Sequence, residues 1–253
     1  MRGLVAGFAP LVLAAQAPDF SPARVEAIFQ GLSYRLLLRD GDRILDRGTL
    51  DAEARLLPCS TYKLPHALIA LEAGVISLDR NTFTCDPAQC HSDHGTLGLE
   101  SAIRQSCLSY FRQVARRLGV DREAAGMKAL GYPGRGSLTP ADAFWVDSPS
   151  FGITLREQLT WIHRFYTEDL GVKPAHLAAV RAATRRTEMP AWTLWGKTGS
   201  TGAHGGHPHG WFVGRVQWKD GRTSDVALLV TSPPEGRALG LEAQARLEQL
   251  LGR

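Results

Sequence analysis

The feature that most constrains this chain is a serine placed three residues before a lysine, at the start of an apolar helical run. Ser60 and Lys63 belong to the segment Pro-Cys-Ser-Thr-Tyr-Lys at 58–63, and apolar residues recur at helical spacing as far as Val75. Residues i and i+3 lie on one helix face, so the hydroxyl and the amine are expected to share one turn. A serine is a weak nucleophile at neutral pH unless a base lies beside it. The pattern therefore predicts an activated serine or, as the simpler alternative, a serine that only caps the helix.

A second short motif lies far downstream, at Lys197-Thr198-Gly199. Each motif is common by chance, and Lys197 on its own would be interpreted as a surface charge. In this order and at this separation, the two form the known pairing of penicillin-reactive enzymes. The combination is much more specific than either half and favours the activated serine.

Length and charge indicate one globular domain without a nucleic-acid partner. The chain has 253 residues, enough for one large domain. Its formal net charge is +4, and the basic residues are scattered, with Arg116-Arg117 and Arg185-Arg186 as the densest pairs. No basic stripe alternates with aromatic residues, so these charges predict a solvated surface.

Residues 1–17 have the pattern of a secretory signal peptide. Arg2 supplies the positive charge, residues 4–14 are apolar but too few to span a bilayer, and Ala-Gln-Ala at 15–17 fits a cleavage site. This predicts that residues 18–253 form a single catalytic domain that is periplasmic or secreted, with no membrane partner in the mature form. The alternative is an apolar leader on a cytoplasmic protein.

The pattern of cysteines and histidines favours a disulfide, buried thiols and a polar loop over a metal site. Cys85 and Cys90 flank a turn and are expected to form a disulfide in an oxidising compartment, with a zinc site that includes His91 and His94 as the rival. Cys59 and Cys107 are expected to be buried thiols that pack as small hydrophobic groups. Three further histidines, expected in a mobile polar loop rather than at a metal, are His204, His207 and His209.

The predicted elements place strands toward both ends of the chain and helices in the middle. Helices are expected over 21–29, 60–73, 99–118, 155–170, 176–184 and 241–251, and strands over 33–38, 43–45, 192–195, 211–218 and 226–231. This order predicts an α+β fold, an α/β sandwich, with a mostly antiparallel sheet flanked by the N- and C-terminal helices. An all-helical subdomain is inserted at about 77–185.

Four ordered segments together resemble the class D β-lactamases, the oxacillinases. Residues 58–72 resemble the nucleophile helix of that family, and residues 99–119 its second motif helix. Phe144-Trp145 resembles its omega-region tryptophan, and Trp-Phe-Val-Gly at 211–214 the strand that follows Lys-Thr-Gly. The likeness covers roughly residues 52–232 and implies the serine β-lactamase and penicillin-binding-protein fold.

The resemblance implies a role for each motif residue. Ser60 would open a β-lactam ring, and Lys63 would act as the base in an N-carboxylated form. Burial lowers the pKa of an amine, and the neutral amine adds carbon dioxide. The indole N–H of Trp145 would donate to that carbamate, Ser106 would pass a proton to the leaving nitrogen, and Lys197 would supply positive charge. Trp145 alone is more often a core residue, and Ser106 alone often bonds its own helix.

Substrate contacts are implied for Thr198, Gly199, Ser200 and Leu108. The backbone N–H groups of Ser60 and Ser200 would form an oxyanion hole. No metal or organic cofactor is implied beyond the carbon dioxide on Lys63, and the partners are β-lactam small molecules. The state expected is a monomer or homodimer.

The sequence departs from the family pattern in three places. Leu108 replaces a valine, and Tyr-Pro-Gly at 132–134 replaces Tyr-Gly-Asn. The carboxylate-binding arginine of the last helix has no clear counterpart, since the nearest arginines are Arg237 and Arg246. Hydroxyls of Thr198 and Ser200 are expected to replace it.

Two rival functions remain, a penicillin-responsive sensor that is acylated without turnover and a D,D-peptidase.

Two acidic residues near the motif helices, Glu72 and Glu100, are expected to be solvated surface carboxylates.

Overall fold

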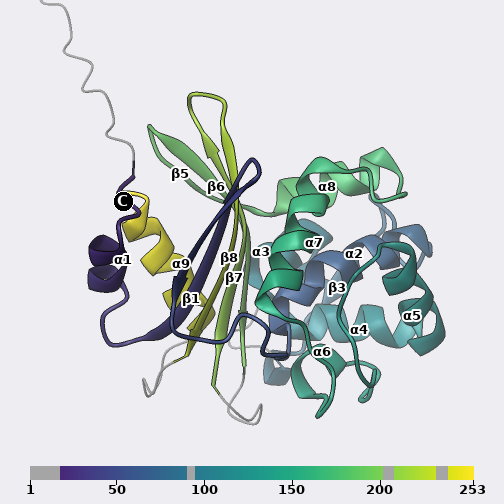
Figure 1. Cartoon of the computed structure of the whole chain (residues 1–253). Coiled ribbons are helices and arrows are strands. Elements are labelled where there is room, and N and C mark those ends of the chain that lie inside the picture. Colours follow the sequence, from purple (N-terminus) through teal and green to yellow (C-terminus); the bar gives the residue numbers. More distant parts are fainter. Residues whose placement is uncertain (1–17, 90–94, 202–207, 232–238) are drawn as a thin grey trace, which may run out of the picture.

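A six-stranded antiparallel sheet divides the protein into two layers of helices (Figure 1). The computed structural model describes residues 18–89, 95–201, 208–231 and 239–253. The strands are ordered β2-β1-β8-β7-β6-β5. Their bounds are β1 Ser33–Asp40, β2 Arg43–Gly48, β5 Arg185–Glu188, β6 Trp192–Ser200, β7 Gly210–Trp218 and β8 Thr223–Thr231. The α+β class predicted from the sequence is confirmed.

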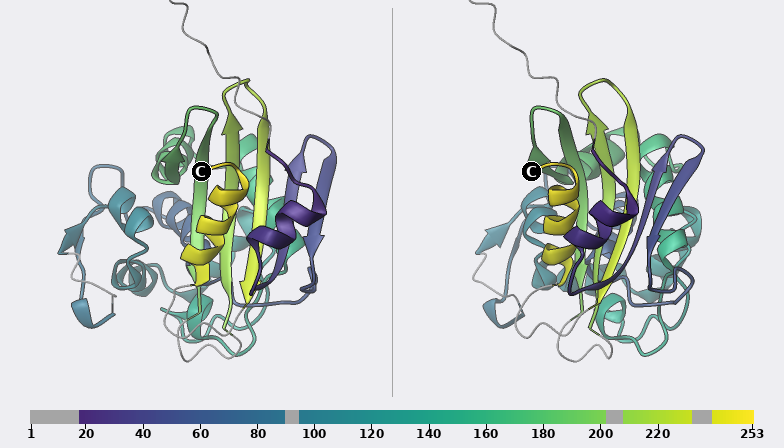
Figure 2. Two further views of the ribbon diagram at one scale, coloured as in Figure 1. Left: turned by 90° about the vertical axis from the view of Figure 1, so that its left-hand side faces the viewer. Right: turned by 60° about the vertical axis from the view of Figure 1, so that its left-hand side comes forward.

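Two helices from opposite ends of the chain cover one face of the sheet (Figure 2). These are α1, Pro22–Ile28, and α9, Leu239–Leu250. Successive side chains of β8 point to opposite faces of the sheet, as in any β-strand, and so pack into different helical layers. Val226, Leu228 and Val230 pack under α1 and α9, whereas Ala227 and Leu229 face the other helices.

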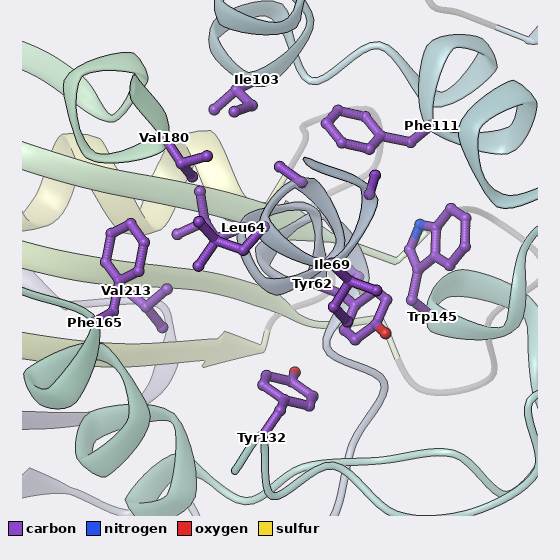
Figure 3. Packing of buried hydrophobic residues seen from close by; sticks show 14 of the residues in the cluster. Tyr62, Leu64, Ile69, Ile103, Phe111, Tyr132, Trp145, Phe165, Val180 and Val213 are labelled. Atoms are coloured by element: carbon purple, nitrogen blue, oxygen red, sulfur yellow. The ribbon is translucent and has the colours of Figure 1, made fainter. Parts of the chain in front are cut away.

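The second layer contains the remaining helices, gathered around α2. The bounds are α2 Lys63–Glu72, α3 Leu99–Gln105, α4 Leu108–Leu118, α5 Val120–Ala129, α6 Phe144–Asp147, α7 Leu155–Thr167 and α8 Pro174–Ala183. Every α2 residue from Lys63 to Leu71 is buried, which is typical of a helix in the centre of a core. Figure 3 shows side chains from surrounding elements, among them Phe111, Trp145 and Val180, packed about this helix.

The sequence prediction missed several local features. The helix expected over 99–118 is broken at Ser106, whose backbone is left-handed (φ 60°), and α4 begins two residues later. Helix α5 and strand β5 were not predicted. A small sheet of β3, Phe83–Thr84, and β4, Thr96–Leu97, was not predicted either. The limits of the predicted helical subdomain remain a prediction.

Several predictions fall outside the described residues, namely the signal peptide 1–17, Cys90, His91 and His94, Arg237, His204 and His207. The Cys85–Cys90 link and its zinc alternative therefore stay predictions. In the described part of the chain, Cys85 Sγ lies 2.6 Å from Cys107 Sγ, and both residues are buried. No helix among the described residues is long and apolar enough to cross a membrane.

Candidate active site

Ser60 lies in a short 3-10 turn, η1 (Cys59–Tyr62), that leads directly into α2. The predicted sharing of one helical turn by Ser60 and Lys63 is confirmed, although that turn is 3-10 rather than α-helical. The residue before the serine, Cys59, has a left-handed backbone (φ 52°), which is unusual for a side chain with a Cβ. Strained backbone of this kind is often found where a functional group must be presented in one orientation.

The amine of Lys63 links two hydroxyl-bearing residues. Its Nζ donates to Ser60 Oγ at 2.6 Å and to the carbonyl oxygen of Ser106 at 3.1 Å, and Ser106 Oγ lies 3.4 Å away. Lys63 is 1% exposed. The serine hydroxyl therefore bonds a buried amine, and no side-chain hydrogen bond caps η1. This geometry supports an activated serine rather than a serine that only caps the helix.

Lys197 approaches the same hydroxyl from β6. Its Nζ donates to Ser106 Oγ at 2.8 Å and to the Thr198 carbonyl oxygen at 2.9 Å, and the side chain is fully buried. Burial first, and then the positive charges of Arg186 and Lys63, hold the pKa of Lys197 well below its usual value. Lys197 is therefore a buried amine at the site, not the surface charge that it would be in isolation.

The break between α3 and α4 positions Ser106. Its left-handed conformation ends α3, and the Cys107 side chain then accepts a hydrogen bond from Tyr110 N at the start of α4. This turn carries the hydroxyl toward both lysines. The continuous helix predicted across this segment would have left Ser106 on a helix face.

Trp145, on α6, lies beside the nucleophile turn with an unused donor. Its ring stacks on Tyr62 with centroids 5.8 Å apart, and the side chain is buried. Within the described residues, no acceptor lies within hydrogen-bonding reach of its Nε1. Figure 3 shows the indole nitrogen on the side of the ring toward α2. A buried donor without an acceptor is costly, so the arrangement fits an additional anion on Lys63.

The Lys-Thr-Gly strand packs tightly against the nucleophile turn. A Cβ added to Gly199 would lie 2.9 Å from the Pro58 carbonyl oxygen and 3.3 Å from Cys59 Cβ, so only glycine allows this approach. Strand β5 pairs with β6 only as far as Trp195. Residues 197–200 of β6 therefore present an edge that no described strand covers.

Ser200 and Thr198 are half-buried, at alternate positions of the same strand. Ser200 Oγ accepts a hydrogen bond from Gly240 N at 2.9 Å, which leaves its O–H to donate. Arg246, one of the two arginines nearest the expected anchor position, instead donates to Glu242 and to the carbonyl oxygen of Ile28. Arg246 is thus not available as a substrate anchor.

The structure also places three other residues that the sequence singles out. Leu108 is partly buried against the main core at the first position of α4. Glu100 is exposed and pairs with Arg104, as expected. Glu72 is not a freely solvated carboxylate, because it accepts from His176 Nδ1 at 2.6 Å and from Lys173 N at the start of α8.

His209 also differs from the expectation of a mobile loop. It is buried, and its Nε2 lies 2.9 Å from the Leu57 carbonyl oxygen, just before the nucleophile turn. Among the described residues, no group of three or more His, Cys, Asp or Glu side chains is arranged to hold a metal ion.

Sequence reasoning missed a buried polar cluster beneath the site. His66 Nδ1 lies 3.0 Å from Glu123 Oε1, and the Tyr62 hydroxyl bonds the same carboxylate. His66 and Glu123 are 1% and 3% exposed. The signal available in the sequence was a histidine three residues after Lys63, on the same helix face.

Comparisons with known proteins agree with this geometry. Residues 43–251 match the family model described as the penicillin binding protein transpeptidase domain. The regulatory protein BlaR1 of Bacillus licheniformis is 31% identical over 172 residues, 67% of this chain and 28% of that protein. The β-lactamase OXA-20 of Pseudomonas aeruginosa is 27% identical over 201 residues, 79% of this chain and 69% of that one.

Solved structures extend the likeness to the whole fold. The class D β-lactamase YbXI from Nostoc is similar with a TM-score of 0.79 at 26% identity, over 90% of this chain and 98% of that one. This chain matches little more than a quarter of the length of BlaR1.

Proposed function

Because this chain belongs to the penicillin-binding protein transpeptidase domain family, with class D β-lactamases among its relatives, we propose that it hydrolyses β-lactams through an acyl-enzyme on Ser60. The observation that carries the proposal is the continuous hydrogen-bonded path Ser60–Lys63–Ser106–Lys197. A nucleophile, an adjacent base and a route for a proton to the leaving group all lie on this path.

We further propose that Lys63 works as an N-carboxylated lysine. Two buried amines, those of Lys63 and Lys197, share the Ser106 hydroxyl, and two ammonium groups at this separation would repel each other. A carbamate on Lys63 replaces this repulsion by attraction and supplies an acceptor for Trp145 Nε1. When present, the carbamate provides an anionic oxygen that can accept a proton.

The acylation step uses the residues of this path in order. Ser60 Oγ attacks the carbonyl carbon of the ring and gives its proton to the base on Lys63. The carbon–nitrogen bond of the ring then breaks, and Ser106 Oγ gives a proton to the nitrogen. Ser106 recovers a proton from the base on Lys63, which regenerates the base, and Lys197 stabilises the developing charge. The N–H groups of Ser60 and Ser200 would form the oxyanion hole, with a contribution of about 3–4 kcal/mol per donor.

Deacylation reverses the roles of the same groups. A water molecule loses a proton to the base on Lys63, and its oxygen attacks the ester carbonyl. The ester bond breaks, and Ser60 Oγ leaves and recovers that proton from the base on Lys63. The substrate carboxylate is held by the hydroxyls of Thr198 and Ser200 at the uncovered edge of β6.

Because residues 1–17 have the pattern of a signal peptide, we propose that the protein acts in the periplasm or outside the cell.

A chromogenic cephalosporin distinguishes the candidate functions. Repeated turnover well beyond one equivalent supports hydrolysis. A single stoichiometric burst supports the alternative of a penicillin-responsive sensor, which the similarity to the regulatory protein BlaR1 favours. Absence of both, with release of D-alanine from a stem-peptide substrate, would indicate a D,D-peptidase and contradict the proposal. Repeating the assay in carbon-dioxide-depleted buffer tests the modified lysine, since hydrolysis is expected to fall and to recover with bicarbonate.

A further inference from the structure

His66 and Glu123 form a buried pair that the proposed mechanism does not use. Glu123 comes from α5 and accepts hydrogen bonds from both His66 and Tyr62. A buried carboxylate is stable only when it is paired and hydrogen-bonded. The imidazole of His66, in ion-pairing distance at 2.9 Å, is the ionisable group that can balance the charge of Glu123.

The other nitrogen of His66 has no such partner. Nε2 is buried, and the described residues offer it no hydrogen bond. A histidine that forms an ion pair with a carboxylate, as the His66–Glu123 geometry allows, has both ring nitrogens as donors. The structure then holds a buried N–H that lacks an acceptor, which is an uncommon and costly arrangement.

The ring of His66 lies close to Trp145 and on the same helix as Lys63. His66 lies one helical turn after Lys63 on α2. Its ring centroid is 5.3 Å from that of Trp145 and 5.7 Å from that of Phe111, and Lys63 Nζ lies 5.7 Å from the same Phe111 ring. Two buried nitrogens without partners among the described residues, Trp145 Nε1 and His66 Nε2, thus belong to neighbouring rings, and one of these rings lies one helical turn after Lys63.

We propose that His66 Nε2–H is a second donor to the carbamate on Lys63, so that the carbamate is held between an indole and an imidazolium. The proposal rests on the proposed function, because it requires the modified lysine. Glu123 acts through His66 by keeping the imidazole charged and oriented, and Tyr62 fixes Glu123. The carbamate and Glu123 then lie at opposite ends of one cation, and each of the two orphan donors gains an acceptor.

The test measures the carbamate directly. The protein is incubated with ¹³C-bicarbonate, and the carbamate signal is followed by ¹³C NMR as bicarbonate is titrated. His66→Phe removes the donor, whereas His66→Asn keeps an N–H. The matched control is His176→Phe, because His176 forms a similar, more exposed histidine–carboxylate pair with Glu72 away from the site. If His66→Phe fails to fold with Glu123 unpaired, His66→Phe/Glu123→Gln carries the test without an unbalanced charge.

The quantity compared is the bicarbonate concentration at which half of the protein carries the carbamate. We expect this concentration to be about ten-fold higher or more in His66→Phe or the double variant than in the wild type, because hydrogen bonds to charged groups are among the stronger ones. His66→Asn should fall between these variants and the wild type, and His176→Phe should match the wild type. Equal occupancy in His66→Phe and His176→Phe would overturn the role of His66 alone. A wild-type protein without any carbamate signal would overturn the modified lysine itself, and with it this inference.

Discussion

Lys63 and Lys197 direct their amines at one hydroxyl, with Nζ atoms 3.4 Å and 2.8 Å from Ser106 Oγ. One lysine comes from α2 and the other from β6, so the site is assembled where the helical layer meets the sheet. Both side chains are buried, and a protein has little reason to bury two amines together for stability alone. The pair is therefore interpreted as catalytic machinery maintained at a cost to stability.

Replacing Lys197 by methionine should abolish acylation and, in carbon-dioxide-depleted buffer where Lys63 is unmodified, raise the melting temperature at neutral pH. The folded-state pKa of Lys197 is lowered, so the folded protein binds this proton less well than the unfolded chain does. The destabilisation is present below the unfolded-state pKa of about 10.4 and disappears as the pH rises toward it. We expect a gain of at least about 2 °C at pH 7.

Calorimetry from pH 7 to pH 10 measures this effect, with Lys219→Met as the surface control because Lys219 is half-exposed. A lower melting temperature for Lys197→Met at pH 7 would show that its two hydrogen bonds outweigh the burial of its charge.

Trp145→Phe should make hydrolysis depend more strongly on added bicarbonate. Phenylalanine retains most of the stacking on Tyr62 but lacks the indole N–H. A lost charge-assisted hydrogen bond is worth about 1.5–3 kcal/mol, which corresponds to a loss of about ten-fold or more in carbamate affinity. Steady-state rates measured across a bicarbonate series test this. The same bicarbonate dependence in variant and wild type would remove Trp145 from the proposed base.

Leu108→Val should speed deacylation. Leu108 carries one methylene more than valine at the first position of α4, next to Ser106, and the larger side chain is expected to restrict water near Lys63. Burst and steady-state phases recorded with one penicillin separate acylation from deacylation, and only the second should increase, by several-fold. An unchanged deacylation rate refutes this role for Leu108.

Ser200→Ala should raise KM for penicillins several-fold and leave kcat less affected. Ser200 Oγ is already an acceptor from Gly240 N, so its proton is available for a substrate carboxylate. The comparison variant is Arg237→Ala, which tests the other candidate anchor. An unchanged KM in Ser200→Ala, together with a large increase in Arg237→Ala, would assign the carboxylate to the arginine.

The sequence predicted the site well where chemistry is encoded in short spacings. Ser60 and Lys63 are separated by one turn, so their placement follows from local geometry, whereas Lys197 lies on β6 beyond the strand predicted over 192–195. The family resemblance supplied Ser106 and Trp145. The sheet, apart from β5, and its two terminal helices followed from periodicity.

What could not be predicted depends on tertiary contacts. The helix break at Ser106 has no glycine or proline, and its left-handed backbone is stabilised by packing and by two lysines from other elements. The pairing of His66 with Glu123 spans 57 positions in the sequence, and no local pattern indicates it. Glu72 appears solvent-facing by helical spacing, yet it pairs with the start of a distant helix.

The central claim is that the hydroxyl of Ser60 is made reactive by the buried amine-bearing side chain of Lys63. Intact-protein mass spectrometry after incubation with a fluorescent penicillin tests it most directly, with Ser60→Ala as the matched variant. The account predicts one added penicilloyl group in the wild type, located on the peptide that contains Ser60, and none in the variant. Equal labelling of the two proteins, or no labelling of either, would contradict it.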